Sequence, residues 1–261
     1  MASAPSQPAR GAVRQILREG QPDTVAVEEP LEIRVDDSAV AVTMRTPGND
    51  EELALGFLYG EGLIAEPRPV GLTEDFAANT VVVGGPLLRQ LDNRRFYTTS
   101  SCGVCGKGAI EEIENHSGVI APGWRGVALH RATLAGLPDR LLQPGFARTG
   151  GLHATGLFNA SLELLCVRED VGRHNAMDKV IGWALQEGLV PFADAVLCVS
   201  GRLSFELVQK AAVAGASVLV GVGAPTSLAV ELAHSRGLTL CGFARGDRVN
   251  VYTGEERLNH G

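Results

Sequence analysis

The chain has 261 residues, 45% of them hydrophobic, which is enough for one large domain or two smaller ones with their own cores. Its formal net charge of −7 argues against a general nucleic-acid or anionic-membrane binder, because such proteins carry a basic surface. No run approaches the roughly 18 apolar residues of a membrane span. Any anionic ligand must therefore be held by a local cluster of donors.

The beginning of the chain, residues 1–22, is predicted to be a flexible tail. It has two prolines and two arginines within its first 14 residues and no apolar stretch of the kind that a secretory signal requires. Three of the five cysteines, Cys166, Cys198 and Cys241, lie in apolar runs. Such runs are typical of reduced, buried thiols and indicate a cytoplasmic protein.

Residues 23–145 are predicted to form a smaller β-rich part. Residues 23–46 alternate apolar and polar side chains around the turn signal Asp36-Asp37-Ser38, which predicts a hairpin. A helix follows, for which Asn49 and Glu52 form a capping-box-like pair. Strands are expected at "NTVVVG" and "RRFYTTS", and helices at "KGAIEEIEN" and at "TLAGLPDRLL", the last stopping near Pro144.

Residues 146–261 are predicted to form an α/β part that holds a ligand. "LHATGLFNASLELLCV" reads as two strands joined by a turn around Asn159, and helices and strands then alternate up to "RVNVYTG". This order implies a sheet flanked by helices. The expected fold class is therefore α/β (α+β), with a mixed sheet.

The motif "TTSSCGVCGKG" places Cys102 and Cys105 two residues apart among small residues, and four explanations stay open. They could be two small residues in a turn, although structural cysteines prefer apolar surroundings. A zinc site would need two more ligands, and His116 and His130 fit no familiar zinc spacing. A redox disulfide matches the order of strand, C-x-x-C and helix, but the preceding segment is β-rich.

The fourth explanation is a persulfide carrier, in which a thiolate accepts a sulfur atom and passes it on. The expected helix start and Lys107 would both favour the thiolate form. Gly103, Gly106 and Gly108 would leave the loop free to enter another protein's active site. The spacing alone does not choose between this role and a redox disulfide.

Other constellations carry chemistry in the second half of the chain. In "EDVGRHNAMDK", Asp170 could cap a helix with a solvated face on which His174 and Asp178 pair, or Arg173 and His174 could line a ligand pocket. His153 in "TGGLHA" could face the same site or be structural. "SGRLS", "VGAPTS" and "FARGDR" each follow a predicted strand, where the loops of an open α/β sheet form a ligand crevice. These loops supply the donors Arg202, Thr226, Ser227, Arg245 and Arg248.

Several stretches together resemble the FdhD/NarQ family of formate dehydrogenase accessory sulfurtransferases. They are "SSCGVCGKGAIEE", "TGGLHATGLF", "REDVGRHNAMDKVIG", "SGRLSFELVQKAA", "VGAPTSLAVELA" and "GLTLCGFARGDRVNVYTG", in the family's order over most of the chain. The resemblance implies a sulfur carrier that takes persulfide sulfur from a cysteine desulfurase. It would deliver this sulfur to the bis(molybdopterin guanine dinucleotide) molybdenum cofactor before insertion into formate dehydrogenase.

The resemblance also assigns residues and partners. Cys102 would carry the persulfide, and Cys105 would assist or resolve it. The cofactor, with GDP as a surrogate ligand, would bind at Phe243, Ala244, Arg245, Gly246, Asp247 and Arg248, a stretch that by composition could equally be a charged turn. A homodimer is expected, with no metal, nucleic acid or membrane as partner.

The implied fold is similar to that of cytidine deaminases, but deaminase chemistry is not expected. It requires H-x-E and P-C-x-x-C, whereas Ala154 and Thr155 follow His153, and Ser101 precedes Cys102. Two rival functions stay open beside the sulfur carrier. One is a non-catalytic chaperone of the cofactor, and the other is a thiol-disulfide oxidoreductase.

Overall fold

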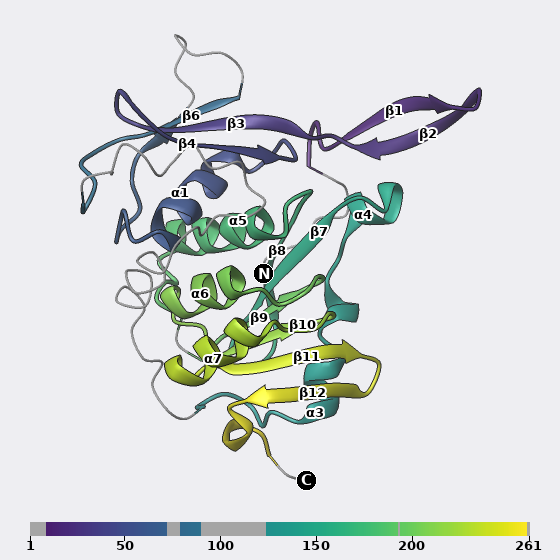
Figure 1. The fold of residues 1–261 in the computed structure, drawn as a ribbon, viewed down its shortest axis with the longest axis vertical. Helices are drawn as coiled ribbons and strands as arrows, with labels where there is room; N and C mark the ends of the chain where they lie inside the picture. The colour runs from purple at the N-terminus through teal and green to yellow at the C-terminus, as the bar shows by residue number, and fades with distance from the viewer. Residues whose placement is uncertain (1–8, 72–78, 90–123, 193, 260–261) are drawn as a thin grey trace.

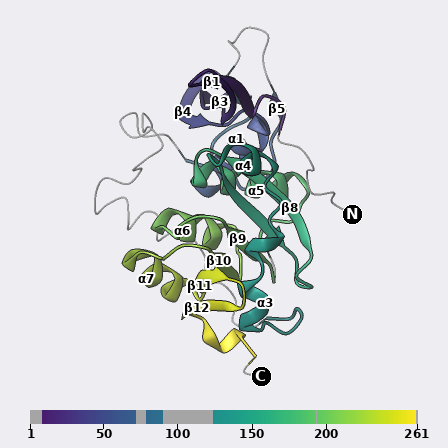
Figure 2. The ribbon, with the colours of Figure 1, turned by 90° about the vertical axis from the view of Figure 1, so that its right-hand side faces the viewer.

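The computed structural model describes residues 9–71, 79–89, 124–192 and 194–259. Three sheets organise them: a two-stranded hairpin, a four-stranded sheet and a six-stranded sheet. Figures 1 and 2 show the hairpin and the four-stranded sheet at one end of the molecule and the six-stranded sheet with its helices at the other.

The hairpin corrects the prediction of a flexible tail over residues 1–22 for the part from residue 13 onward, while residues 1–8 lie outside the described ranges. Strand β1 (Val13–Arg18) pairs antiparallel with β2 (Gln21–Ala26), and the pair projects away from the body (Figure 1). The turn between them has positive φ at Glu19 (52°) and Gly20 (79°). A two-residue turn with positive φ at both positions matches the strand twist, and glycine favours it.

The four-stranded sheet has the order β4-β3-β6-β5. Strands β3 (Glu29–Val35) and β4 (Ser38–Arg45) form the predicted hairpin, and the predicted strand at "NTVVVG" is β6 (Thr80–Val83), parallel to β3. The short β5 (Val70–Gly71) completes the sheet. Leu31, Ile33 and Val81 on this sheet share a core cluster with leucines of α1 (Asp50–Gly60).

The predicted capping box at the start of α1 is wrong. Asn49 has φ 60° and makes no side-chain cap, so it does not hold the geometry in which an N-cap side chain reaches the first turn. Arg45 instead binds the first helical residue, with Nε and Nη2 at 3.0 and 2.8 Å from the carboxylate oxygens of Asp50. The helix start is thereby tied to the end of β4.

The six-stranded sheet confirms the mixed sheet that the sequence predicted. Its order is β12-β11-β10-β9-β7-β8, in which β9, β10 and β11 run parallel and the other pairings are antiparallel. The strands are β7 (His153–Phe158), β8 (Leu164–Asp170), β9 (Val196–Val199), β10 (Val218–Gly221), β11 (Thr239–Arg245) and β12 (Arg248–Thr253).

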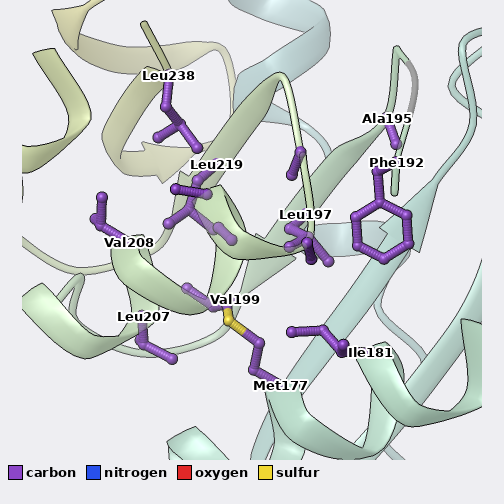
Figure 3. Close-up of a cluster of buried hydrophobic side chains, with 14 of the residues drawn as sticks. Met177, Ile181, Phe192, Ala195, Leu197, Val199, Leu207, Val208, Leu219 and Leu238 are labelled. Atoms are coloured by element: carbon purple, nitrogen blue, oxygen red, sulfur yellow. The ribbon is translucent and has the colours of Figure 1, made fainter. Parts of the chain in front are cut away.

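Helices cover both faces of this sheet. On one face, α5 (Arg173–Gln186), α6 (Phe205–Val213) and α7 (Ser227–Arg236) share a core cluster with Leu197, Val199 and Leu219. Figure 3 shows side chains of α5 and α6 beside these strand residues. Val196 and Cys198 face the opposite way, into a second cluster with leucines from residues 129–141. Successive residues of a strand point to opposite faces, so this apolar alternation builds two cores on one sheet.

The segment before β7 differs from the prediction of one helix ending near Pro144. Helix α3 (Arg131–Ala135) and the 3-10 turn η1 (Pro138–Arg140) are short, and Pro144 begins a new helix, α4 (Pro144–Thr149). Proline suits the first position of a helix because the N–H it lacks would have no partner there. The division of the chain at residue 145 and the likeness to cytidine deaminases stay predictions.

Within the described ranges, no helix combines the length and the apolar composition that spanning a membrane would require.

Candidate functional site

The thiol pair lies outside the described residues. Cys102, Cys105 and His116 all fall within 90–123, so their predicted roles stay predictions. His130 stands at the N-cap position of α3 and is exposed. In the part of the chain that the structure describes, no three His, Cys, Asp or Glu side chains gather into a possible metal site.

The three glycine-containing loops meet at the carboxyl ends of β9, β10 and β11. The backbone N–H of Gly223 donates to the carbonyl of Gly201 at 3.0 Å, and that of Phe243 donates to the carbonyl of Gly223 at 3.2 Å. Leu203 and Thr226 close a second link, from the N–H of Thr226 to the carbonyl of Leu203 at 3.0 Å. "SGRLS", "VGAPTS" and "FARGDR" thus form one continuous edge.

Close backbone approach explains one glycine of this edge. A Cβ placed on Gly223 would lie 2.9 Å from the Cα and 3.0 Å from the backbone N of Arg202, closer than side-chain carbons come to backbone atoms in real proteins. Glycine therefore lets the loop after β10 lie flat against the loop after β9. Beside it, Thr226 caps α7, because its hydroxyl oxygen accepts from Ala229 N–H at 3.4 Å, while Ser227 is the first residue of α7.

The stretch from Phe243 to Arg248 ends β11 and turns into β12. Phe243 has φ 55° and is 49% exposed, so its ring presents an apolar face to solvent. Ala244 is buried in the second core cluster, and its side chain is unavailable to a ligand. Gly246, with φ 60°, forms the tight turn with Asp247, and Arg245 pairs with Arg248 across it.

Both arginines of this turn are exposed. In the described ranges, the side chains of Arg245 and Arg248 make no hydrogen bond or ion pair with the protein. The turn therefore offers two uncommitted guanidinium groups next to an exposed aromatic ring. This is the set that the sequence predicted for a phosphate- and purine-bearing ligand, except for the buried Ala244.

A second group of basic side chains lies along the same edge. His153 begins β7, and its Nδ1 lies 3.4 Å from the point that a Cβ on Gly201 would occupy. The Cδ of Arg173, the first residue of α5, lies 3.9 Å from that point. His174 Nε2 lies 3.1 Å from Ser204 Oγ, in the loop that carries Arg202. We call His153, Arg173, His174 and Arg202 the basic cluster.

Burial and charge keep the two histidines of the basic cluster neutral. Burial lowers the pKa of His153, and the positive charges of Arg173 and Arg202 lower it further, whereas Asp170 opposes the shift. The imidazole ring of His153 is therefore neutral and can accept a proton when an anion approaches.

The pKa of His174 is lowered more strongly, to about 4. Burial is the largest cause, and Arg173 and Lys210 add to it, while Glu206 opposes it from 3.7 Å. His174 is thus the member of the basic cluster that faces α6.

Asp170 organises the turn that delivers Arg173 and His174 to the edge. Its carboxylate is fully buried, pairs with Lys179 Nζ at 2.7 Å and accepts the backbone N–H groups of Thr46 and Gly172 at 3.1 and 2.8 Å. Asn175 donates to it at 3.1 Å. Asp170 is therefore a buried anchor between β4 and α5, and Gly172, rather than Asp170, is the N-cap residue of α5.

The predicted pairing of His174 with Asp178 on a solvated face is wrong. Asp178 is buried and binds Lys210 of α6 at 2.7 Å, while His174 contacts Ser204 and Glu206. Helices α1 and α6 cover this side of α5, so side chains four residues apart turn to partners on neighbouring elements. Sequence reasoning missed Lys179 and Lys210 as buried cations. Their helical spacing alone does not distinguish a buried polar face from an exposed one.

Comparisons with known proteins bear on the same residues. The model of the FdhD/NarQ family matches residues 26–259, which include the basic cluster, the three loops and the thiol motif. The chain belongs to the FdhD/NarQ family. The match spans nearly the whole chain and confirms the resemblance indicated by the sequence motifs.

Two relatives and one solved structure show how far the similarity extends. The sulfur carrier protein FdhD of Mycobacterium tuberculosis is 49% identical over 257 residues, covering 91% of this chain and 92% of its own. That of Anaeromyxobacter dehalogenans is 47% identical over 272 residues, covering 95% and 93%. A crystal structure from Desulfotalea psychrophila, described as a formate dehydrogenase accessory protein, is 26% identical with a TM-score of 0.72, covering 95% of this chain and 97% of its own.

Proposed function

We propose that the protein is a sulfur carrier that supports formate dehydrogenase. The observation that carries this proposal is family membership over residues 26–259, together with relatives at 49% identity that are named sulfur carrier proteins. The C-x-x-C motif lies within the matched range and supplies the nucleophile that sulfur transfer needs. The related structure, described as a formate dehydrogenase accessory protein, supports the choice of client enzyme.

The finer proposal is a persulfide on Cys102, loaded by a cysteine desulfurase. The Cys102 thiolate attacks the outer sulfur of the desulfurase persulfide, the donor S–S bond breaks, and the donor cysteine leaves as a thiolate. No net oxidation occurs in this step, because one persulfide replaces another. The desulfurase is the sulfur donor in this step, and the carrier acts as a sulfurtransferase.

In this proposal Cys105 releases the sulfur from the Cys102 persulfide. Its thiolate attacks the Cys102 sulfur, hydrosulfide leaves with the electron pair of the broken bond, and Cys102 and Cys105 become a disulfide. A cellular dithiol then reduces that disulfide and restores both thiols. The hydrosulfide is delivered to the bis(molybdopterin guanine dinucleotide) molybdenum cofactor, which is the substrate of the transfer.

The proposed place for the cofactor is the edge that ends in Phe243, Arg245, Gly246, Asp247 and Arg248. The exposed ring of Phe243 offers a stacking face for guanine, and the two uncommitted guanidinium groups suit phosphate. Asp247 could accept guanine N–H groups. Ala244 contributes only backbone, since its side chain is in the core. A homodimer, a cytoplasmic location and the absence of a bound metal belong to the same proposal.

The decisive experiment is intact mass analysis after incubation with a cysteine desulfurase and cysteine. We expect one added sulfur on the wild type, removed by dithiothreitol, and none on Cys102→Ala. Cys166→Ala is the matched control, because this thiol is buried and should leave the adduct unchanged. An adduct that persists in Cys102→Ala and disappears in Cys105→Ala would move the persulfide to Cys105. If neither substitution matters, the carrier proposal fails and a cofactor chaperone becomes the better explanation.

A further inference from the structure

The positive charges of the basic cluster are not paired with acidic side chains of the described residues. Arg173 and Arg202 make no hydrogen bond or ion pair within the described residues. The Nε of Arg173 is also buried and has no partner there. A buried donor without a partner costs free energy, so native proteins seldom keep one unless a water or a ligand completes it.

A second unpartnered polar atom lies on the same face of β7. The hydroxyl oxygen of Thr155 is buried and makes no hydrogen bond with any described residue, and Thr155 is only 1% exposed. His153 and Thr155 are two residues apart on one strand, so their side chains leave the sheet on the same side. This is the side covered by α5, where Leu157 of the same strand meets Met177. Two orphaned polar atoms therefore belong to the region where β7 meets α5.

The surrounding acids do not neutralise the cluster. Asp170 is held by Lys179, and Asp178 is held by Lys210, in each case at 2.7 Å. Glu206, at 3.7 Å from His174 Nε2, is the carboxylate that remains on the α6 side.

The cluster therefore combines two permanent positive charges and two neutral rings with one nearby acid, Glu206, whose carboxylate is hydrogen-bonded to Ser204 and faces His174. Like charges placed together disfavour the folded state unless an anion compensates them.

We propose that the basic cluster is a subsite for a phosphate or diphosphate group, with Arg173 and Arg202 as the charged donors and His153 and His174 as rings that gain a proton with the anion. Two guanidinium groups fit the several oxygens of a phosphate better than a single carboxylate. The inference rests on the cluster itself and holds whether or not the protein carries sulfur.

The subsite also has a defined neighbour along the edge. Gly201 precedes Arg202, binds Gly223 through its carbonyl, and Gly223 binds Phe243 in the same way. The basic cluster and the Phe243 turn are thus two ends of one hydrogen-bonded row of loops. A ligand with phosphates in the middle and a ring at one end could lie along this row.

The test uses inorganic pyrophosphate as the probe and the full-length protein. Histidine ring signals are followed by NMR over a pH series, with and without pyrophosphate. We expect the pKa values of His153 and His174 to rise on binding, because a nearby anion stabilises the imidazolium form. A rise of one unit corresponds to about tenfold tighter binding to the protonated ring.

Variants locate the binding. Arg173→Gln and Arg202→Gln should each weaken pyrophosphate binding about tenfold in calorimetric titration, the typical worth of a charge-assisted hydrogen bond. Arg18→Gln is the matched control, an exposed arginine of the β1–β2 hairpin outside the row of loops, and should bind pyrophosphate normally. Arg202 is exposed in a loop, so its variant decides the question even if Arg173→Gln folds poorly. Unmoved histidine signals, or equal affinity in both variants and wild type, would overturn the proposal. Neither readout depends on the persulfide, so the two proposals fail separately.

Discussion

Gly56 of α1 and Gly182 of α5 touch through their backbones. A Cβ on Gly56 would lie 1.8 Å from the carbonyl oxygen of Asp178, and a Cβ on Gly182 would lie 1.8 Å from that of Glu52. The two helices therefore cross where neither has a side chain. This crossing joins the N-terminal sheet to the helix that carries Arg173 and His174, so the crossing distance also sets where those side chains lie.

Alanine at either glycine should force the helices apart. We expect Gly56→Ala and Gly182→Ala each to lower the free energy of unfolding by about 3 kcal/mol, the upper range of overpacking in a tight core. Urea unfolding measures the loss. Gly71→Ala is the control, since a Cβ there would have no neighbour within 4 Å. A loss below that of Gly71→Ala would show that the helices do not touch at this point.

The buried pair of Asp178 and Lys210 should be costly to break from one side. Asp178→Asn leaves a buried ammonium 2.7 Å from a neutral amide, and we expect a loss of about 3 to 5 kcal/mol in the free energy of unfolding. The double variant Asp178→Leu with Lys210→Met should recover most of that loss, because no unpaired charge remains. Glu255→Gln is the control, since its pair with Arg131 is exposed and should contribute less than about 1 kcal/mol. Equal losses in the buried and exposed pairs would contradict this account.

His174 should make the fold sensitive to acid. Its folded pKa of about 4 lies below the ordinary value of 6.5, so between these values the unfolded chain binds a proton that the folded protein does not. The free energy of unfolding should therefore be highest above pH 6.5 and should fall by up to about 3 kcal/mol as the pH drops to 4.

Removing the ring should remove this dependence. His174→Asn should lose less stability than wild type over the same pH range, measured by urea unfolding at each pH. His234→Asn, at an exposed histidine of α7, is the control and should follow the wild type. Identical pH slopes for wild type and His174→Asn would show that burial does not hold His174 neutral.

The three cysteines of the described ranges should be inert in the folded protein. Burial raises the pKa of Cys166 and Cys241 to about 12 and raises that of Cys198 as well, so little thiolate forms at pH 8. We expect alkylation to label them only after unfolding, as followed by peptide mass analysis. Rapid labelling of any of the three in the native state would contradict their burial, and it would also complicate the assignment of a persulfide to Cys102.

The turn after β11 should discriminate between purine nucleotides. We expect the protein to bind GDP more tightly than ADP, and Arg245→Ala to weaken GDP binding while leaving the persulfide on Cys102 unchanged. Calorimetric titration of both nucleotides against both proteins measures this. Asn250→Ala, an exposed residue of β12, is the control. Equal affinity for GDP and ADP would leave the other two loops of the edge as the place of binding.

The sequence by itself determined that strands and helices alternate into a sheet flanked by helices, and that glycine-containing loops follow its strands. The uninterrupted apolar runs in "AVLCVS" and "SVLVGVG" predict buried strands, and a glycine after each strand predicts a loop at its carboxyl end. Parallel strands place those loops together without further information. The β1–β2 hairpin was missed because its strands are largely exposed, so no pattern of burial marks them.

Only the tertiary structure decided which charged residues are partners. Asp178 and Lys210 are 32 positions apart and meet because α5 and α6 pack side by side, while His153 and Arg173 meet because β7 begins where α5 begins. Helical spacing within "RHNAMDK" predicts neighbours on one helix but cannot say which face another element covers. Local patterns follow from the backbone repeat of a single element, whereas the choice of partner depends on how elements distant in the chain share one core.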